Sequence, residues 1–138
     1  MAFVVDASAS AGWFLRDEAN DISADIARRL AREVGRVPDL YWHEMRNLLI
    51  QSFRRERISE AELFLSLSQL ERLNLQTASD QNPTLIGQLA LKHNITAYDA
   101  AYLALAKSEG LPLASFDKAL RRASAAEEVT LLPAHPTP

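Results

Sequence analysis

The chain of 138 residues has no cysteine, only four glycines and no long apolar run. Without cysteine it cannot form disulfides, a thiolate zinc site or a cysteine nucleophile, and it fits a reducing cytoplasm. Four glycines are too few for a phosphate-cradling loop, and neither a GxGxxG nor a P-loop motif is present. No stretch approaches the roughly 20 apolar residues of a membrane span, and Asp6 interrupts the first apolar run too early for a secretory signal. We therefore expect a cytoplasmic protein with no membrane partner.

The composition is typical of one folded domain. Hydrophobic residues make up 48% and charged residues 24%, and a chain of this length can bury a core without covalent links. We assign residues 1–132 to a single domain and the proline-rich residues 133–138 to a flexible tail. The formal net charge is −3, although basic residues cluster at Arg28–Arg29, at Arg54–Arg55 with Arg57, and at Lys118 with Arg121–Arg122. Such clusters are either phosphate contacts or solvated helix faces, so charge alone does not decide the partner.

Short apolar runs alternate with longer segments of helical period, which predicts an α/β fold with a parallel sheet. The expected strands are residues 2–6, 36–38, 73–77, 112–116 and 129–132. The expected helices are residues 9–16, 21–34, 40–56, 59–72, 83–92, 97–109 and 117–125.

Several residues mark the expected helix ends. Gly35 and Gly110 stand where helices should finish, since glycine readily adopts the left-handed conformation found there. Ser59 and Glu62 have the spacing of a capping box. Pro83 suits the first turn of its helix, where a missing N–H has no cost.

Two aspartates directly follow strand-like runs. Asp6 closes the apolar run at residues 2–5, and Asp117 closes the run at residues 111–116. Ligands of open α/β sheets bind beyond the carboxyl ends of the strands, so both side chains could face one crevice. The structural alternative for each is an aspartate that caps a helix or turn.

Two further acids interrupt apolar helical stripes. Glu44 shares a helix face with Leu40 and Leu48, and Asp99 shares one with Tyr102 and other apolar residues. The alternatives are structural: Glu44 could pair with Arg46 or another cation at the edge of its stripe, and Asp99 stands at capping-box spacing from Thr96.

The four acids together indicate more than each does alone. Two like charges about 5 Å apart repel by roughly 3 kcal/mol at an effective dielectric near 20. If the four carboxylates converge, a divalent cation is the natural compensation, and carboxylate oxygens are preferred ligands of Mg²⁺ and Mn²⁺. Composition and periodicity do not establish that they converge.

Four motifs resemble those of the PIN-domain family, in the same order and with matching gaps across about 130 residues. They are Phe3-Val4-Val5-Asp6-Ala7-Ser8 with Trp13-Phe14-Leu15 and Asp17-Glu18; Val37-Pro38-Asp39-Leu40 with Glu44 and Asn47-Leu48-Leu49; Thr96-Ala97-Tyr98-Asp99-Ala100-Ala101-Tyr102-Leu103-Ala104-Leu105-Ala106; and Leu113-Ala114-Ser115-Phe116-Asp117 with Leu120. The short single-domain form is similar to VapC-type toxins of toxin–antitoxin pairs.

This resemblance implies a three-layer α/β/α sandwich with a central parallel sheet. It also implies an endoribonuclease dependent on Mg²⁺ or Mn²⁺, with Asp6, Glu44, Asp99 and Asp117 as metal ligands and catalytic residues. The expected partners are an RNA substrate, with tRNA among the targets, a VapB-type antitoxin and a second copy in a homodimer. The family commonly has threonine where this chain has Ser115. Serine keeps the hydroxyl, so Ser115 is included among the expected catalytic residues. Ser8 is a similar candidate near Asp6.

Three other classes compete with this interpretation. A PIN fold that binds RNA or protein without cutting has no reason to keep four mutually repelling acids. A receiver-type phosphoacceptor domain requires adjacent acids after its first strand and a lysine that ends a late strand, whereas Ala7 follows Asp6 and Lys118 follows Asp117. A flap-type DNA nuclease carries additional helical segments for which this chain has no room.

Overall fold

The computed structural model describes residues 1–79 and 82–135. Its strands are β1 (Ala2–Val5), β2 (Val34–Pro38), β3 (Leu75–Ala78), β4 (Leu113–Ala114) and β5 (Leu131–Leu132). Its α-helices are α1 (Ala7–Ser10), α2 (Asp21–Arg29), α3 (Leu40–Arg54), α4 (Glu60–Glu71), α5 (Pro83–His93), α6 (Ala97–Glu109) and α7 (Lys118–Ala126). Two 3₁₀ turns, η1 (Ala11–Trp13) and η2 (Arg16–Glu18), connect α1 to α2.

All neighbouring strands of the sheet are parallel, in the order β3-β2-β1-β4-β5. From β1 the chain first builds outward through β2 and β3, and it then returns to the other side of β1 to add β4 and β5. The direction of building therefore reverses between β1 and β4. At such a switch point the loops that leave the two strands diverge and open a crevice, which is the usual ligand site of this class of sheet.

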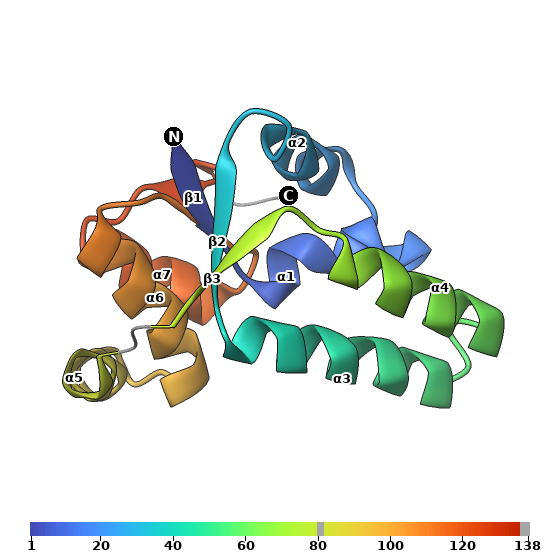
Figure 1. The fold of residues 1–138 in the computed structure, drawn as a ribbon. Coiled ribbons are helices and arrows are strands. Elements are labelled where there is room, and N and C mark those ends of the chain that lie inside the picture. The colour runs from blue at the N-terminus through green and yellow to red at the C-terminus, as the bar shows by residue number, and fades with distance from the viewer. Residues whose placement is uncertain (80–81, 136–138) are drawn as a thin grey trace.

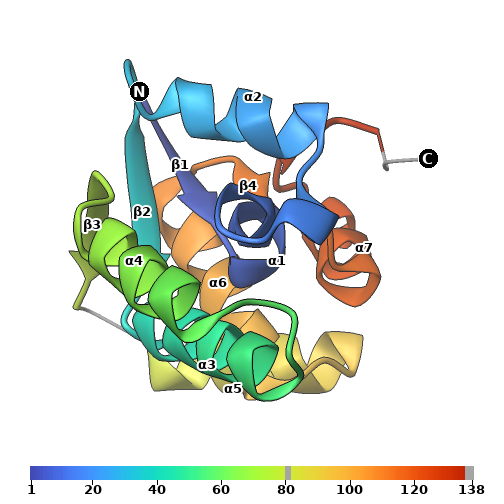
Figure 2. The ribbon, with the colours of Figure 1, turned by 90° about the vertical axis from the view of Figure 1, so that its right-hand side faces the viewer.

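Helices cover both faces of the sheet and give the predicted three-layer α/β/α sandwich (Figure 1). In Figure 1 the sheet is seen nearly edge-on, with α5, α6 and α7 on one side and α1 to α4 on the other. Figure 2 shows β1 running behind α1 and below α2. Phe3, Val4 and Val5 of β1 are fully buried, as expected for a central strand covered on both faces. Helix α6 contributes a continuous buried run from Ala100 to Ala106.

Two predicted helices near the N-terminus are wrong in extent. The segment predicted as a helix over residues 9–16 begins earlier, is broken into α1 and η1, and has ended by Phe14. A Cβ at Gly12 would lie 2.6 Å from the Glu18 carbonyl oxygen, so the absent side chain lets the chain fold back tightly on η2.

The helix predicted over residues 21–34 ends at Arg29, and Gly35 lies inside β2 rather than at a helix end. Gly35 is paired with Phe3 and Leu75 on the two neighbouring strands. A Cβ there would lie 2.4 Å from Leu75 Cδ2 and 2.8 Å from Leu30 Cδ2. Close packing, not a left-handed turn, is therefore the reason for this glycine.

The other predicted helix ends are confirmed. Gly110 ends α6 with φ 66°, Ser59 and Glu62 form the capping box of α4, and Pro83 stands in the first turn of α5. The strand predicted over residues 112–116 is shorter, because Ser115 and Phe116 leave the sheet to build the site described below.

The C-terminal edge is shorter than predicted, since β5 covers only Leu131–Leu132. Part of the predicted tail at 133–138 is anchored, because the Pro133 carbonyl accepts a hydrogen bond of 2.9 Å from the Arg121 guanidinium; residues 136–138 lie outside the described residues. No helix in the described ranges is both long and apolar enough to cross a membrane.

Candidate active site

Asp6 lies at the switch point and is the most buried of the four predicted acids, with 4% of its surface exposed. It follows β1 and caps α1, so that its Oδ1 accepts from the backbone N–H of Ala9 at 2.9 Å. Ser8 Oγ donates to the same oxygen at 2.7 Å, and Ser115 Oγ donates to Oδ2 at 2.6 Å. Both carboxylate oxygens are therefore fixed in position. Asp6 also caps a helix, which was the structural alternative for this residue.

The two serines tie the end of β1 to the end of β4. Ser8 Oγ accepts from the backbone N–H of Phe116 at 2.9 Å, and Ser115 Oγ accepts from the N–H of Asp117 at 3.1 Å. Each hydroxyl thus donates to Asp6 and accepts from the chain that follows β4. The predicted supporting positions of Ser115 and Ser8 beside Asp6 are both found in the structure.

Burial raises the pKa of Asp6 from 3.8 to about 6, against the lowering effect of the hydrogen bonds from Ser115, Ser8 and Ala9. The nearby charge of Asp117 raises it further. Asp6 forms no ion pair within the described residues. A carboxylate held in this way gains strongly from a bound cation.

Asp117 and Asp99 lie at the start of neighbouring helices. Asp117 caps α7, with Oδ2 accepting from the N–H of Leu120 at 2.9 Å. Asp99 is in the first turn of α6, where Thr96 Oγ1 accepts from the Asp99 N–H at 3.1 Å. Partial burial and the charge of Asp117 raise the pKa of Asp99. No donor among residues 1–79 and 82–135 reaches the carboxylate oxygens of Asp99.

Glu44 completes the set from α3. The buried stripe of this helix consists of Tyr41, Met45, Leu49 and Ser52, and Glu44 lies half-buried at its edge. Its partner is not Arg46, which contacts His43, but the hydroxyl of Tyr102, which donates to Oε1 at 2.5 Å. Burial raises the pKa of Glu44, while this hydrogen bond lowers it and the charge of Asp99 raises it.

Tyr102 is the residue that the sequence analysis did not assign to the site. It follows Asp99 by one turn of α6 and was interpreted as a core residue, which it also is, being 1% exposed. Burial and the hydrogen bond to Glu44 raise the pKa of its hydroxyl, so that Tyr102 remains a proton donor to Glu44. The nearest signal in the sequence is its i+3 spacing from Asp99.

The four acids form a row at one end of the sheet rather than a closed cluster. Electrostatic repulsion links Asp6 with Asp117, Asp117 with Asp99, and Asp99 with Glu44. Among the described residues, however, no three acidic or histidine side chains are close enough to hold an ion between them in this arrangement. Metal binding by the quartet therefore stays a prediction.

The chemistry of the row nevertheless fits a hard divalent ion. Its donors are carboxylate oxygens, and in the described ranges none of the four acids is neutralised by lysine, arginine or histidine. Glu44 Oε2, Asp117 Oδ1 and both oxygens of Asp99 receive no hydrogen bond from the described residues. Such oxygens are open to a cation and its water molecules.

Comparison with known proteins places this arrangement in a family. A model of the PIN domain matches residues 3–126. The chain is 35% identical over 124 residues to Ribonuclease VapC3 of Pyrobaculum aerophilum, covering 87% of this chain and 92% of that protein. It is 33% identical over 124 residues to Ribonuclease VapC1 of Mycobacterium tuberculosis, covering 88% and 86%. The crystal structure of PAE2754 from Pyrobaculum aerophilum shares the fold, with a TM-score of 0.70, 18% identity and coverage of 96% and 90%. The chain belongs to the PIN-domain family and to its VapC-type group.

Proposed function

We propose that this chain is an endoribonuclease of the VapC type that hydrolyses RNA phosphodiester bonds with Mg²⁺ or Mn²⁺. The observation that carries the proposal is the row of four acids at the switch point, none of which has a cationic partner within the described residues. Two relatives above 30% identity are named ribonucleases, which supports RNA as the substrate.

Asp6, Glu44 and Asp99 are the first-choice ligands of the ion, and Asp117 contributes through a water molecule or a second ion. When bound, the ion would supply an acidified water and stabilise charge on the phosphoryl oxygens. The residues of the chain position this chemistry. Ser8 and Ser115 hold the Asp6 carboxylate in one orientation, and the hydrogen bond from the Tyr102 hydroxyl orients Glu44 and favours its charged form.

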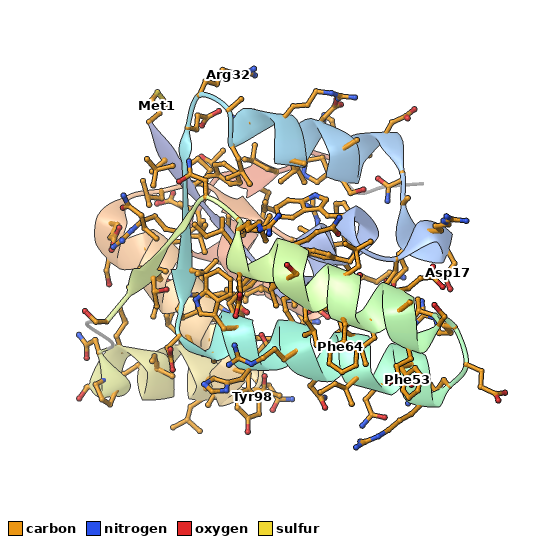
Figure 3. All side chains as sticks on the ribbon, turned by 45° about the vertical axis from the view of Figure 1, so that its right-hand side comes forward. Met1, Asp17, Arg32, Phe53, Phe64 and Tyr98 are labelled. Atoms are coloured by element: carbon orange, nitrogen blue, oxygen red, sulfur yellow. The ribbon has the colours of Figure 1, made fainter. Side chains whose placement is uncertain are left out.

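We further propose that a VapB-type antitoxin neutralises the protein and that the protein forms homodimers. Both partners need exposed apolar surface, and the structure offers it at Phe64 and Leu65. Each of these side chains is 60% exposed on α4, and Phe53 on the adjacent α3 is 36% exposed. Figure 3 shows Phe53 and Phe64 on the pair of helices α3 and α4. Light scattering of the purified protein, alone and with the candidate antitoxin, tests both assemblies.

The nuclease proposal is tested with Asp99→Asn. This carboxylate accepts no hydrogen bond from the described residues, so we expect its replacement to leave the fold intact. Asp25→Asn is the matched control, since Asp25 is an exposed acid paired with Arg28 on α2. Each protein is incubated with total cellular RNA, including tRNA, in Mg²⁺ or Mn²⁺ and in EDTA. Mn²⁺ binding is measured by calorimetry.

We expect discrete fragments from the wild type and Asp25→Asn, none from Asp99→Asn, and none in EDTA. Full activity in EDTA would contradict the metal dependence. Cleavage by Asp99→Asn at the wild-type rate would contradict the site. An absence of both cleavage and Mn²⁺ binding in the wild type would leave a PIN fold that binds its partners without cutting.

A further inference from the structure

Beside the acidic row, a groove of about 370 Å³ extends along one face of α3. Its lining residues come from α1, α3 and the turn that follows α3; they are Ala7, Glu44, Asn47, Leu48, Gln51, Ser52, Arg55 and Arg57. Glu44 belongs both to the groove and to the candidate active site. The groove is therefore continuous with the place where cleavage is proposed, and the nuclease chemistry as described leaves the rest of its lining without a role.

The polar residues of the groove follow one another at helical spacing. Glu44, Asn47, Gln51 and Arg55 are three or four residues apart and so lie on the same face of α3. At 1.5 Å per residue the row is about 16 Å long. Its charge changes along this length, from the acid through two amides to a guanidinium. A chain of phosphates placed in the groove is repelled or metal-bound at one end and attracted at the other.

The two arginines at the far end are not equivalent. Arg57 donates to Asp17 at 2.7 and 3.0 Å and to Glu18 at 3.1 Å, so its charge is offset within the protein. Arg55 forms no ion pair with any residue in the ranges 1–79 and 82–135. The Arg57 ion pairs fasten the turn after α3 to η2 and so fix the position from which Arg55 projects. Arg55 is the side chain available to an anionic ligand.

We propose that this groove binds a single-stranded segment of the substrate RNA next to the bond that is cut. This inference rests on the proposed nuclease function and extends it. Arg55 contacts a backbone phosphate about three helical turns from the site, and Asn47 and Gln51 contact sugars or base edges between them. The distance from Arg55 to Glu44 thereby selects which phosphodiester reaches the acidic row.

The lining favours RNA over a protein segment in this groove. Its largest apolar side chain is Leu48, which is already half-buried against the core. The exposed aromatic residues Phe53 and Phe64, which a protein partner would use as anchors, do not line it. Phe53 and Arg54 instead line a separate hollow with residues 56–59 and Glu62. The polar groove and the hollow beside Phe53 thus adjoin at Arg57, but no aromatic side chain lines the groove.

The pair Arg54 and Arg55 offers a matched experiment. Both arginines are exposed at the end of α3, but only Arg55 lines the groove. Arg55→Ala keeps the backbone hydrogen bond from the Arg55 N–H to the Gln51 carbonyl, so the helix end is preserved. Gln51→Glu is a second variant, which places a carboxylate in the middle of the groove without changing its shape.

Binding of a labelled, mixed-sequence single-stranded RNA oligonucleotide is measured by fluorescence anisotropy in the Asp99→Asn background, which does not cleave. We expect Arg55→Ala to bind about tenfold more weakly than Arg54→Ala at low salt. Its plot of log affinity against log salt should be shallower by about 0.7, the contribution of one phosphate contact on a single strand. In the active background, Arg55→Ala and Gln51→Glu should raise KM with little change in kcat.

Equal binding and equal KM for Arg54→Ala and Arg55→Ala, with cleavage retained, would overturn the inference and leave the nuclease function standing. The groove would then be a site for a protein partner. A loss in kcat alone would also overturn it, because Arg55 would then act through the fold and not on the RNA. Absence of cleavage by the wild type would instead remove the proposed function, and the inference with it.

Discussion

Replacing Asp6 by asparagine should make the metal-free protein more stable at neutral pH, although it removes a ligand from the proposed site. The pKa of Asp6 rises from 3.8 to about 6 in the fold. Because the folded pKa is above the unfolded one, the carboxyl group destabilises the fold at high pH. The cost is absent below pH 3.8, grows between 3.8 and 6, and is complete above 6. At 1.36 kcal/mol per pH unit it reaches about 3 kcal/mol.

Asparagine avoids this cost and keeps most of the hydrogen bonds. Its Oδ1 can still accept from Ser8 and Ala9, and its Nδ2 can donate to Ser115 Oγ, which now donates to Asp6. The hydroxyl hydrogen of Ser115 must turn away, which loses about 1 kcal/mol. The free energy of unfolding should therefore increase by about 2 kcal/mol at pH 7.5. At pH 5 the Asp6 cost is only about half as large, so the gain should nearly vanish.

Urea denaturation in EDTA, followed by circular dichroism at both pH values, measures these differences. Glu44 and Asp99 titrate in both proteins, so their effect on the difference in free energy of unfolding largely cancels. The control Asp25→Asn should change the free energy of unfolding by only a few tenths of a kcal/mol. Added Mg²⁺ should reverse the order by stabilising the wild type alone. A less stable Asp6→Asn at pH 7.5, or a difference independent of pH, would refute the reasoning.

Three other substitutions test separate parts of the structure. Tyr102→Phe removes a hydrogen bond that lowers the pKa of Glu44, so the acid limb of the pH–rate profile for RNA cleavage should move to higher pH; an unmoved profile contradicts the role of Tyr102. Gly35→Ala should lower the free energy of unfolding by about 1–3 kcal/mol, because the new Cβ would meet Leu75 Cδ2 at 2.4 Å. If urea denaturation gives this variant the stability of the wild type, the strands separate easily at this point. Glu56→Gly should raise the free energy of unfolding by about 1 kcal/mol, because Glu56 has φ 59°. A lower free energy of unfolding in the same assay would mean that the Glu56 side chain compensates for this backbone conformation.

Helix ends show what sequence could and could not predict in this fold. Helices α3, α5, α6 and α7 all finish with a residue of positive φ, at Glu56, Asn94, Gly110 and Glu128. Only Gly110 was predicted, because glycine carries a recognisable signal. At Glu56 the N–H of the next residue bonds to the Ser52 carbonyl and the Glu56 N–H to the Phe53 carbonyl, which is the same helix-ending motif. A glutamate gives no sequence signal for this motif.

The candidate site also contains some features that the sequence could predict and others that it could not. Asp6 and Asp117 could be placed from sequence, because residues at the ends of parallel strands share an edge of the sheet. Glu44 was expected on the stripe of Leu40 and Leu48, but it lies at the edge of the buried stripe, as in the structural alternative, and its partner was not foreseen. The hydrogen bond from Tyr102 joins α6 to α3 across 58 residues, and helical periodicity within either segment contains no information on that distance. The groove beside Glu44 depends likewise on how α1 and the turn after α3 pack together.

The pairing of β1 with β4 has a consequence for the chain during its synthesis. Asp6 leaves the ribosome well before Ser115, its hydrogen-bond donor, which follows 109 positions later. The chain between these two residues must be made before the carboxylate is fixed, and contacts so distant in sequence form late. The apolar surface on α3 and α4 precedes β4 along the chain and can emerge earlier. A nascent molecule would then expose the surface proposed to bind the antitoxin before its acidic row is complete.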